Sequence, residues 1–296
     1  MNGKNILSIM TAVFTFLAYG CLSAQEKAQE VEEVEEVTEA GGGSGGERWE
    51  SQDFPVLERG IDVLTPRTLR ARSLLFLVEH RARKALKDDA FQDFLGLDAG
   101  GLKVGLSLRY GFTDWLEGGL YRLNGQTEIF DTYEFDLKCR LLEESVHGVA
   151  LAVRGGVTWF AQSKMEDASG GFAQLLVGKY VNPHLRLGTG LLYHSESSGE
   201  MKSTADDAFS VAIPVQLEIR FNRRIAWEIE GAVNVAGYGA AHSIIATSLK
   251  IVTWRHTFSI IFGNNRYTSS DGIVANSPRS LDEAVIGFLI TREFNF

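Results

Sequence analysis

The chain has 296 residues, of which 45% are hydrophobic, 10% aromatic and 23% charged, with a formal net charge of −9. This hydrophobic share is enough for a folded protein and excludes a wholly disordered chain. A mean hydropathy of −0.04 argues against a bundle of membrane-spanning helices, and the acidic balance argues against a general nucleic-acid binder. These averages leave room for a membrane protein whose hydrophobic residues alternate with polar ones.

The amino end has the pattern of a secretory signal peptide. Lys4 precedes an apolar stretch, Ile6 to Gly20, that ends in small residues, and we expect cleavage after Ala24, which makes residues 1–24 the signal. The alternative is a lipoprotein signal ending at Cys21, for which Leu17 lies one position too far upstream.

Residues 25–60 are predicted to form an acidic, glycine-rich tail. Between residues 25 and 53 there are ten acidic and two basic residues, which gives a local charge of −8, and the run from Gly41 to Gly46 has the composition of a flexible linker. Like charges at this density repel one another and resist packing. We expect a solvated periplasmic tether, with a segment that binds a periplasmic partner as the alternative.

From residue 72 onward the hydrophobic residues recur with a period of two. In Tyr133 to Leu141 every odd position is apolar and every even position is charged, a pattern that a β-strand sorts onto two faces. Phe209 to Phe221 repeats the alternation over thirteen residues. Strands of soluble sandwiches are usually about five or six residues long, whereas tilted strands that cross a bilayer need about 9–11. The alternation therefore favours membrane-spanning strands.

The pattern predicts twelve strands, at residues 72–82, 101–110, 114–122, 131–142, 148–160, 172–181, 184–194, 208–221, 225–236, 243–252, 255–263 and 284–296. Connections after even-numbered strands are short, and those after odd-numbered strands are mostly long. One rim of short turns, one rim of long loops and an even number of strands are typical of an outer-membrane barrel. We therefore predict an all-β fold over residues 61–296, a single closed antiparallel transmembrane β-barrel with periplasmic turns and extracellular loops. Closure is required because open sheet edges in hydrocarbon leave backbone groups unpaired.

The last strand ends on Phe294, Asn295 and Phe296. Barrel-assembly machinery commonly recognises a carboxy-terminal strand ending in Phe, so Phe294 and Phe296 are the candidate assembly signal. Arg292 falls on the apolar face, and we expect it near a rim, where its long side chain reaches the lipid headgroups. Aromatic residues toward the strand ends are expected to form girdles at both membrane interfaces: Tyr110, Trp115, Tyr121, Tyr133, Trp159, Tyr180, Tyr193, Trp227 and Trp254.

If the apolar face meets lipid, the opposite face lines the lumen. Its candidate residues are Lys103, Arg109, Glu134, Asp136, Lys138, Arg140, Arg154, Arg186, Glu218, Arg220, Glu228 and Glu230. Charges of both signs favour mutual pairing, because unpaired buried charges are costly. Two interpretations stay open: a channel whose charged constriction filters small polar or weakly anionic solutes, and a structural or partner-binding barrel whose lumen is closed by salt bridges.

A third interpretation is an outer-membrane lipid hydrolase. Some twelve-stranded outer-membrane barrels are phospholipases with a His-x-Ser pair on the lipid face, and residues 193–197 look similar. Side chains alternate along a strand, so His194 points to the face opposite Ser195 and is out of phase with Ser197. The sequence therefore predicts no catalytic residues and no metal or other cofactor, since no cluster of metal ligands and no phosphate loop stands out. The expected partners are outer-membrane lipid and the assembly machinery, not nucleic acid.

Four short segments resemble an uncharacterised family of outer-membrane β-barrels, known as a domain of unknown function in bacterial envelope proteins. They are Glu79-His80-Arg81, Phe94 to Asp98, Arg109 to Asp114 and Lys138 to Leu142. The resemblance extends from about residue 60 to the end and is most specific at 74–142. It departs from the family where Ala82 follows His-Arg, because the family tends to have an aromatic residue there. The likeness implies the barrel and its location but no reaction.

Overall fold

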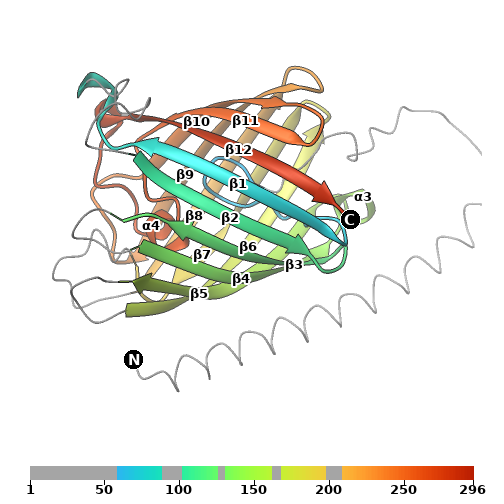
Figure 1. Cartoon of the computed structure of the whole chain (residues 1–296), viewed down its shortest axis with the longest axis horizontal. Coiled ribbons are helices and arrows are strands. Elements are labelled where there is room, and N and C mark those ends of the chain that lie inside the picture. Colours follow the sequence, from blue (N-terminus) through green and yellow to red (C-terminus); the bar gives the residue numbers. More distant parts are fainter. Residues whose placement is uncertain (1–58, 89–101, 126–130, 162–167, 198–208) are drawn as a thin grey trace, which may run out of the picture.

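The computed structural model describes residues 59–88, 102–125, 131–161, 168–197 and 209–296. These residues form a closed barrel of twelve antiparallel strands, each paired with its neighbours in sequence, and β1 pairs with β12 to complete the ring (Figure 1). The predicted fold class is therefore confirmed. The signal peptide, the acidic tail up to residue 58 and the Phe94–Asp98 motif lie outside the described residues. In the described ranges no helix is long and apolar enough to cross a membrane.

The strands are β1 (Ser73–Ala82), β2 (Leu102–Gly111), β3 (Leu116–Leu123), β4 (Asp131–Leu142), β5 (Ala150–Ala161), β6 (Ala168–Asn182), β7 (Leu185–His194), β8 (Ser210–Arg220), β9 (Ile225–Gly237), β10 (Ile244–Val252), β11 (His256–Gly263) and β12 (Val285–Asn295). Their order and positions agree with the twelve predicted strands. β6 departs most, because it begins at Ala168 rather than at residue 172. Its start has the composition of a loop, yet Ser169 and Gly170 pair with Trp159 and Thr158 of β5.

The two rims of the barrel differ in the length of their connections. The short-turn rim carries the connections after even-numbered strands, and the longest of these contains α3 (Glu144–His147). Gly148 ends α3 with a φ of 69°, a left-handed conformation that glycine adopts without steric cost. The long-loop rim carries the other connections, including η2 (Leu86–Asp88) and η3 (Leu281–Glu283), which are tied by an ion pair between Lys87 and Asp282.

The outer face is apolar and carries aromatic residues near both rims. Tyr110, Phe112, Trp227 and Trp254 are exposed toward the short-turn rim. On the other side Tyr133 and Trp159 stack with their ring centroids 5.3 Å apart at the long-loop ends of β4 and β5. Outer aromatic side chains near both ends of the strands suit the two interfaces of a bilayer.

Two of the predicted girdle residues face inward instead. Tyr121 is buried and donates a hydrogen bond to Glu79, and Tyr180 bonds with Arg220. Both follow the inward phase of their strand, which aromatic character alone does not reveal. Arg292 is exposed near the short-turn rim, where it contacts His256 and lies over the ring of Phe294.

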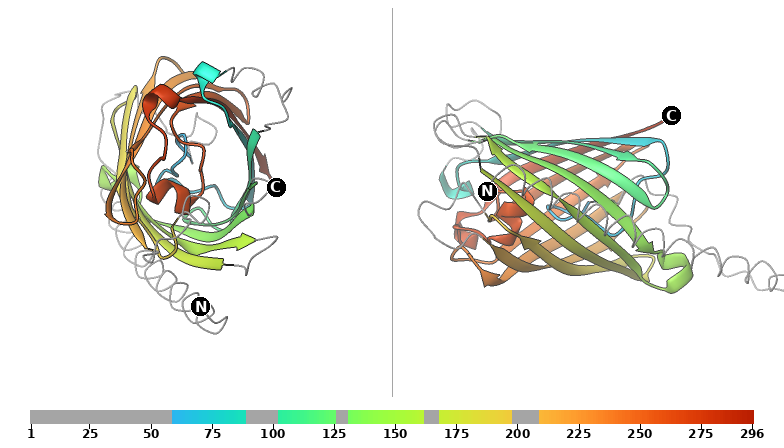
Figure 2. Two further views of the ribbon diagram at one scale, coloured as in Figure 1. Left: turned by 90° about the vertical axis from the view of Figure 1, so that its left-hand side faces the viewer. Right: turned by 90° about the horizontal axis from the view of Figure 1, so that it is seen from below.

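Two segments fold into the barrel. The N-terminal plug (residues 59–72) precedes β1, and the loop plug (residues 264–277) follows β11 and contains α4 (Ser270–Val274), all of whose residues are buried. Viewed from the long-loop rim, both lie within the ring of strands (Figure 2, left). Residues 264–283, between the predicted strands 255–263 and 284–296, were expected to form one of the long loops at the rim. Their polar composition has that character, but the inner wall supplies partners for their polar groups.

Candidate functional site in the barrel lumen

The inner wall carries most of the charged residues that alternation assigned to the lumen. The following are buried: Lys103, Arg109, Glu134, Asp136, Lys138, Arg154, Arg186, Glu218, Arg220, Glu228 and Glu230. Arg140 differs, because β4 has an irregularity between Arg140 and Leu142 and the strand alternation shifts there. Its side chain is 24% exposed and pairs with Glu143 beyond the end of the strand.

One network of ion pairs crosses β2 to β5. Arg109 donates from Nη1 and Nη2 to the two oxygens of Asp136 at 3.0 and 2.8 Å, and from Nε to Glu117 at 2.9 Å. Arg154 shares Asp136 at 2.9 Å and reaches Glu134 at 3.2 Å. Bidentate arginine–carboxylate pairs are strong and geometrically specific, so this side of the wall is held in one arrangement.

The N-terminal plug is bound to the wall through its backbone. The amides of Ile61, Asp62 and Val63 donate to the carboxylate of Glu230 at 3.0, 2.7 and 3.0 Å. Gln216 donates to the carbonyl of Val63 at 2.8 Å. The three amides point one way because residues 60–63 form a turn, closed by a hydrogen bond from Gly60 N–H to Val63 O. A single carboxylate thus anchors the innermost turn of the plug.

The rest of the N-terminal plug is fixed by charges nearer the short-turn rim. The ammonium group of Lys138 donates to the carbonyls of Thr65 and Arg67, and Glu117 accepts from the amide of Leu69 at 2.7 Å. Lys138 and Glu117 are themselves paired at 2.9 Å. Backbone groups of the plug are therefore inserted among the wall charges as additional donors and acceptors.

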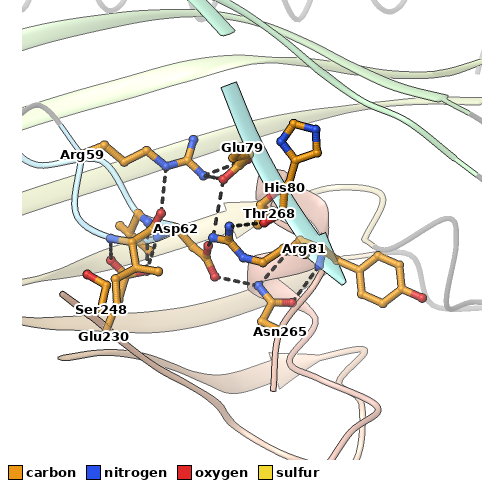
Figure 3. Close-up of polar contacts among 12 residues, drawn as sticks. Arg59, Asp62, Glu79, His80, Arg81, Glu230, Ser248, Asn265 and Thr268 are labelled. Carbon is orange, nitrogen blue, oxygen red and sulfur yellow. Dashed lines mark hydrogen bonds and ion pairs between the residues drawn. The ribbon is translucent and has the colours of Figure 1, made fainter. Parts of the chain in front are cut away.

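The two plugs and β1 meet in a buried polar cluster, drawn in Figure 3. Asp62 of the N-terminal plug receives hydrogen bonds from Arg81 of β1 at 2.7 Å and from Asn265 of the loop plug at 3.0 Å. Glu79 of β1 pairs with Arg59 of the N-terminal plug at 3.4 Å. In the same view His80 points away from this cluster, and its ring stacks on Phe288 at 4.3 Å.

The loop plug is also held by hydrogen bonds to wall charges. Glu134 of β4 accepts from the amide and the hydroxyl of Ser270, the first residue of α4. Thr268 lies 2.5 Å from the hydroxyl of Tyr121, which in turn donates to Glu79. These contacts connect the loop plug to the same group of residues that holds the N-terminal plug.

Apolar packing completes the closure. Val63 and Leu64 of the N-terminal plug join Ile273 and Val274 of α4 in one cluster. The wall residues of this cluster are Ala152, Leu176, Leu192, Ala212, Ala232 and Ile244. The small alanine side chains leave room for main chain inside the ring. Between the plugs and the wall the described residues enclose a cavity of about 30 Å³, lined by Arg59, Asp62 and Arg154 among others, which is room for about one or two water molecules.

Alternation did not assign several buried polar residues to the lumen. They are Asp62, Glu79, Arg81, Glu117, Gln216 and Lys250. Glu79 and Arg81 share the inner face of β1 with Leu75 and Leu77, so apolar residues there do not mark the lipid side. The spacing of two residues between Glu79 and Arg81, which puts both on one face of the strand, is a signal that could have identified them.

His194 faces the lumen side, and its surroundings differ from those of a catalytic base. Its two ring nitrogens lie 2.8 Å from the Thr158 hydroxyl and 3.0 Å from the Glu196 amide. The hydroxyl of Ser195 accepts a hydrogen bond from the amide of Gly171 instead. A nucleophile and its base must be within hydrogen-bond reach of each other, and this pair is not arranged so. In the described part of the chain no three His, Cys, Asp or Glu residues are grouped to hold a metal.

The sequence matches, over residues 58–294, a family model described as a membrane-bound beta barrel domain (DUF5777). No curated protein matches the chain. Among solved structures it resembles an outer membrane channel from Pseudomonas putida F1, with 13% identity, a TM-score of 0.52, and coverage of 79% of this chain and 100% of that one. It is also similar to the NanC porin, with 11% identity, a TM-score of 0.46, and coverage of 75% and 100%. The toluene transporter TbuX of Ralstonia pickettii aligns with 10% identity and a TM-score of 0.39, over 78% and 92%. At these identities the likeness to the Pseudomonas channel concerns the fold.

Proposed function

The chain belongs to this family of membrane-bound β-barrel domains, and from that premise we propose that it is an outer-membrane channel for small polar or weakly anionic solutes, held closed by its two plugs. The observation that supports the proposal is that main chain, and not side chains alone, fills the lumen. Barrel width grows with strand number: about eight strands are filled by side chains, whereas about 16–18 leave an aqueous channel. Twelve strands fall between these limits, so withdrawal of the plugs would open a pore.

The tethers of the N-terminal plug suit reversible opening. Its backbone is bound by charged side chains of the wall, such as Glu230, Lys138 and Glu117. Water can replace the plug as partner of each of these groups once the lumen is hydrated, which limits the cost of withdrawal. The fold shared with the Pseudomonas channel is in keeping with this role.

A closed structural or partner-binding barrel is the second candidate, and the cavity of about 30 Å³ favours it. Single-channel recording in planar bilayers separates the two. We expect the refolded wild type to be mostly closed, and a variant lacking both residues 59–66 and residues 268–276 of the loop plug to give a steady conductance. A variant lacking residues 25–53 is the matched control, since it shortens the chain but keeps both plugs, and it should stay closed.

Migration of unheated samples on SDS gels reports whether each variant has folded into a barrel. A folded barrel that lacks both segments and passes no current would contradict the channel and favour the structural role. Hydrolysis of phospholipid by the wild type, abolished by His194→Ala, would instead support the hydrolase.

The proposed location is the bacterial outer membrane, with the short-turn rim and the acidic tail in the periplasm. The alternation of short and long connections supports it. Phe296 is 80% exposed and Phe294 lies on the last strand, so both suit recognition by assembly machinery.

A further inference from the structure

Beside the N-terminal plug, near the short-turn rim, is a group of basic residues that we call the rim cluster. It consists of Arg67, Arg186, Arg220 and Lys250, with the carboxylates Glu218 and Glu228 and the hydroxyl of Tyr180 between them. Arg186 is the second residue of β7, directly across from Glu218 of β8 and Tyr180 of β6. Four cations thus face two carboxylates, an excess of two positive charges.

Both carboxylates of the rim cluster are already engaged. Glu218 accepts from Nε of Arg220 at 2.6 Å, and Glu228 accepts from Lys250 and, at 2.8 Å, from Ser248. Glu230, farther into the lumen, is occupied by the three amides of the N-terminal plug. Oε2 of Glu218 lies 3.9 Å from Nη2 of Arg186 and has no hydrogen-bond partner among the described residues, so Glu218 balances part of the charge of Arg186 without accepting a hydrogen bond from it.

Arg186 has donors to spare. Its side chain is 4% exposed, and its one ion pair within the described residues, from Nη2 to Glu218, spans 3.9 Å. No described residue accepts a hydrogen bond from its Nε or Nη1. These two groups flank Nη2 on the guanidinium, and each can donate a charge-assisted hydrogen bond to an oxygen of a carboxylate, sulfate or phosphate. Burial of a guanidinium with two unpaired N–H donors destabilises the fold unless a bound group accepts hydrogen bonds from them.

Arg67, on the N-terminal plug, experiences the positive charge of the rim cluster. Burial, together with the charges of Arg220 and Arg186, lowers the pKa of Arg67. Arg67 is partly exposed and Arg220 is the last residue of β8, so the rim cluster lies near the mouth of the barrel. A small ion that enters from the short-turn side meets Arg220 before Arg186, which pairs with Glu218 two residues farther in.

We propose that the rim cluster is a binding site for a small oxyanion, with Arg186 as its principal donor. The site accepts the planar or tetrahedral oxygens of a carboxylate, sulfate or phosphate. The identification of this anion as a solute of the channel rests on the proposed function, whereas binding itself does not. In the closed barrel the site holds the anion at the short-turn mouth, next to the segment that must move for the lumen to open.

Isothermal titration calorimetry tests the site with full-length protein in detergent micelles and chloride buffer. Inorganic sulfate, inorganic phosphate and acetate are the probes, and we expect saturable binding of at least one. Arg186→Gln should weaken that binding roughly tenfold or more, because it removes a positive charge and two charge-assisted donors. Glu218→Gln should strengthen it, because it removes a competing negative charge. Arg292→Gln, at the same rim but on the outer face, should leave it unchanged.

The opposite responses of the two variants keep the test decisive if Arg186→Gln does not fold. Absence of saturable heat with all three anions would overturn the site, and so would equal affinities in the wild type and the Glu218→Gln variant; water alone would then satisfy Arg186. If anions bind but no variant conducts, the channel falls and the site stands. If the barrel conducts and no anion binds, the anion site is refuted and the channel is supported.

Discussion

Asp136 accepts hydrogen bonds from two arginines on different strands, Arg109 of β2 and Arg154 of β5. A carboxylate shared in this way balances the charges of both arginines. Its loss therefore leaves two buried positive charges without their partner. Alternation alone predicted all three residues, because their strands carry a regular polar phase. It did not predict Glu117, since Gly118 and Gly119 follow it and leave β3 without a clear apolar face. Side-chain phase is predictable from sequence only where both faces carry side chains.

Asp136→Ala should therefore lower the free energy of unfolding by about 3–5 kcal/mol, the usual cost of breaking a buried ion pair from one side. Arg122→Ala is the control, because its pair with Asp131 is 39% and 29% exposed and should contribute less than about 1 kcal/mol. Urea unfolding from lipid vesicles, followed by tryptophan fluorescence, gives both values. Equal, small losses in the two variants would mean that the luminal network is fully hydrated.

At the scale of elements, the strands were predictable and the plugs were not. A long strand can be recognised in the sequence by its period of two, because one face must be apolar toward lipid and the other carries charged residues. The loop plug has the composition of an exposed turn. Its burial depends on Glu134 and Asn234, which lie far away in the chain and supply partners for Ser270 and Val274. Contacts of that kind follow from the closed ring and not from local sequence.

Glu230→Ala should release the innermost turn of the N-terminal plug, since it leaves three buried amides without their acceptor, at about 1–3 kcal/mol each. We expect faster hydrogen exchange at Ile61, Asp62 and Val63, together with more frequent channel opening. Glu230→Gln is the graded control, because Oε1 alone accepts from Asp62 and Val63, and it should exchange at an intermediate rate. Unchanged protection of the three amides in Glu230→Ala would show that apolar packing, and not this carboxylate, holds the plug.

At the scale of the molecule, closure was predictable from physics: an open twelve-stranded sheet has two unpaired edges, and hydrocarbon does not tolerate them. The filled interior was not predictable in this way. The proposed orientation rests on the two unequal rims, because short turns face the periplasm in outer-membrane barrels. The arrangement therefore predicts which residues a reagent outside the cell can reach.

An impermeant maleimide added to intact cells should label Ala241→Cys, at the long-loop rim, and leave Val146→Cys, on α3 at the short-turn rim, unlabelled. Both positions are exposed in the structure. Permeabilising the outer membrane should bring Val146→Cys to the same level, and the parent chain gives the background. Labelling of Val146→Cys in intact cells would reverse the assigned orientation.

The seam between β1 and β12 has a consequence for the order of folding. It joins Ser73 to Asn295, 222 positions apart, so it is the slowest kind of contact to form. The N-terminal plug runs straight into β1, and its anchors stand on strands from β3 to β10. The plug is therefore either enclosed while β1 and β12 pair, or inserted into a barrel that has already closed. Whichever route the chain takes, the last step of assembly traps its own leading segment inside.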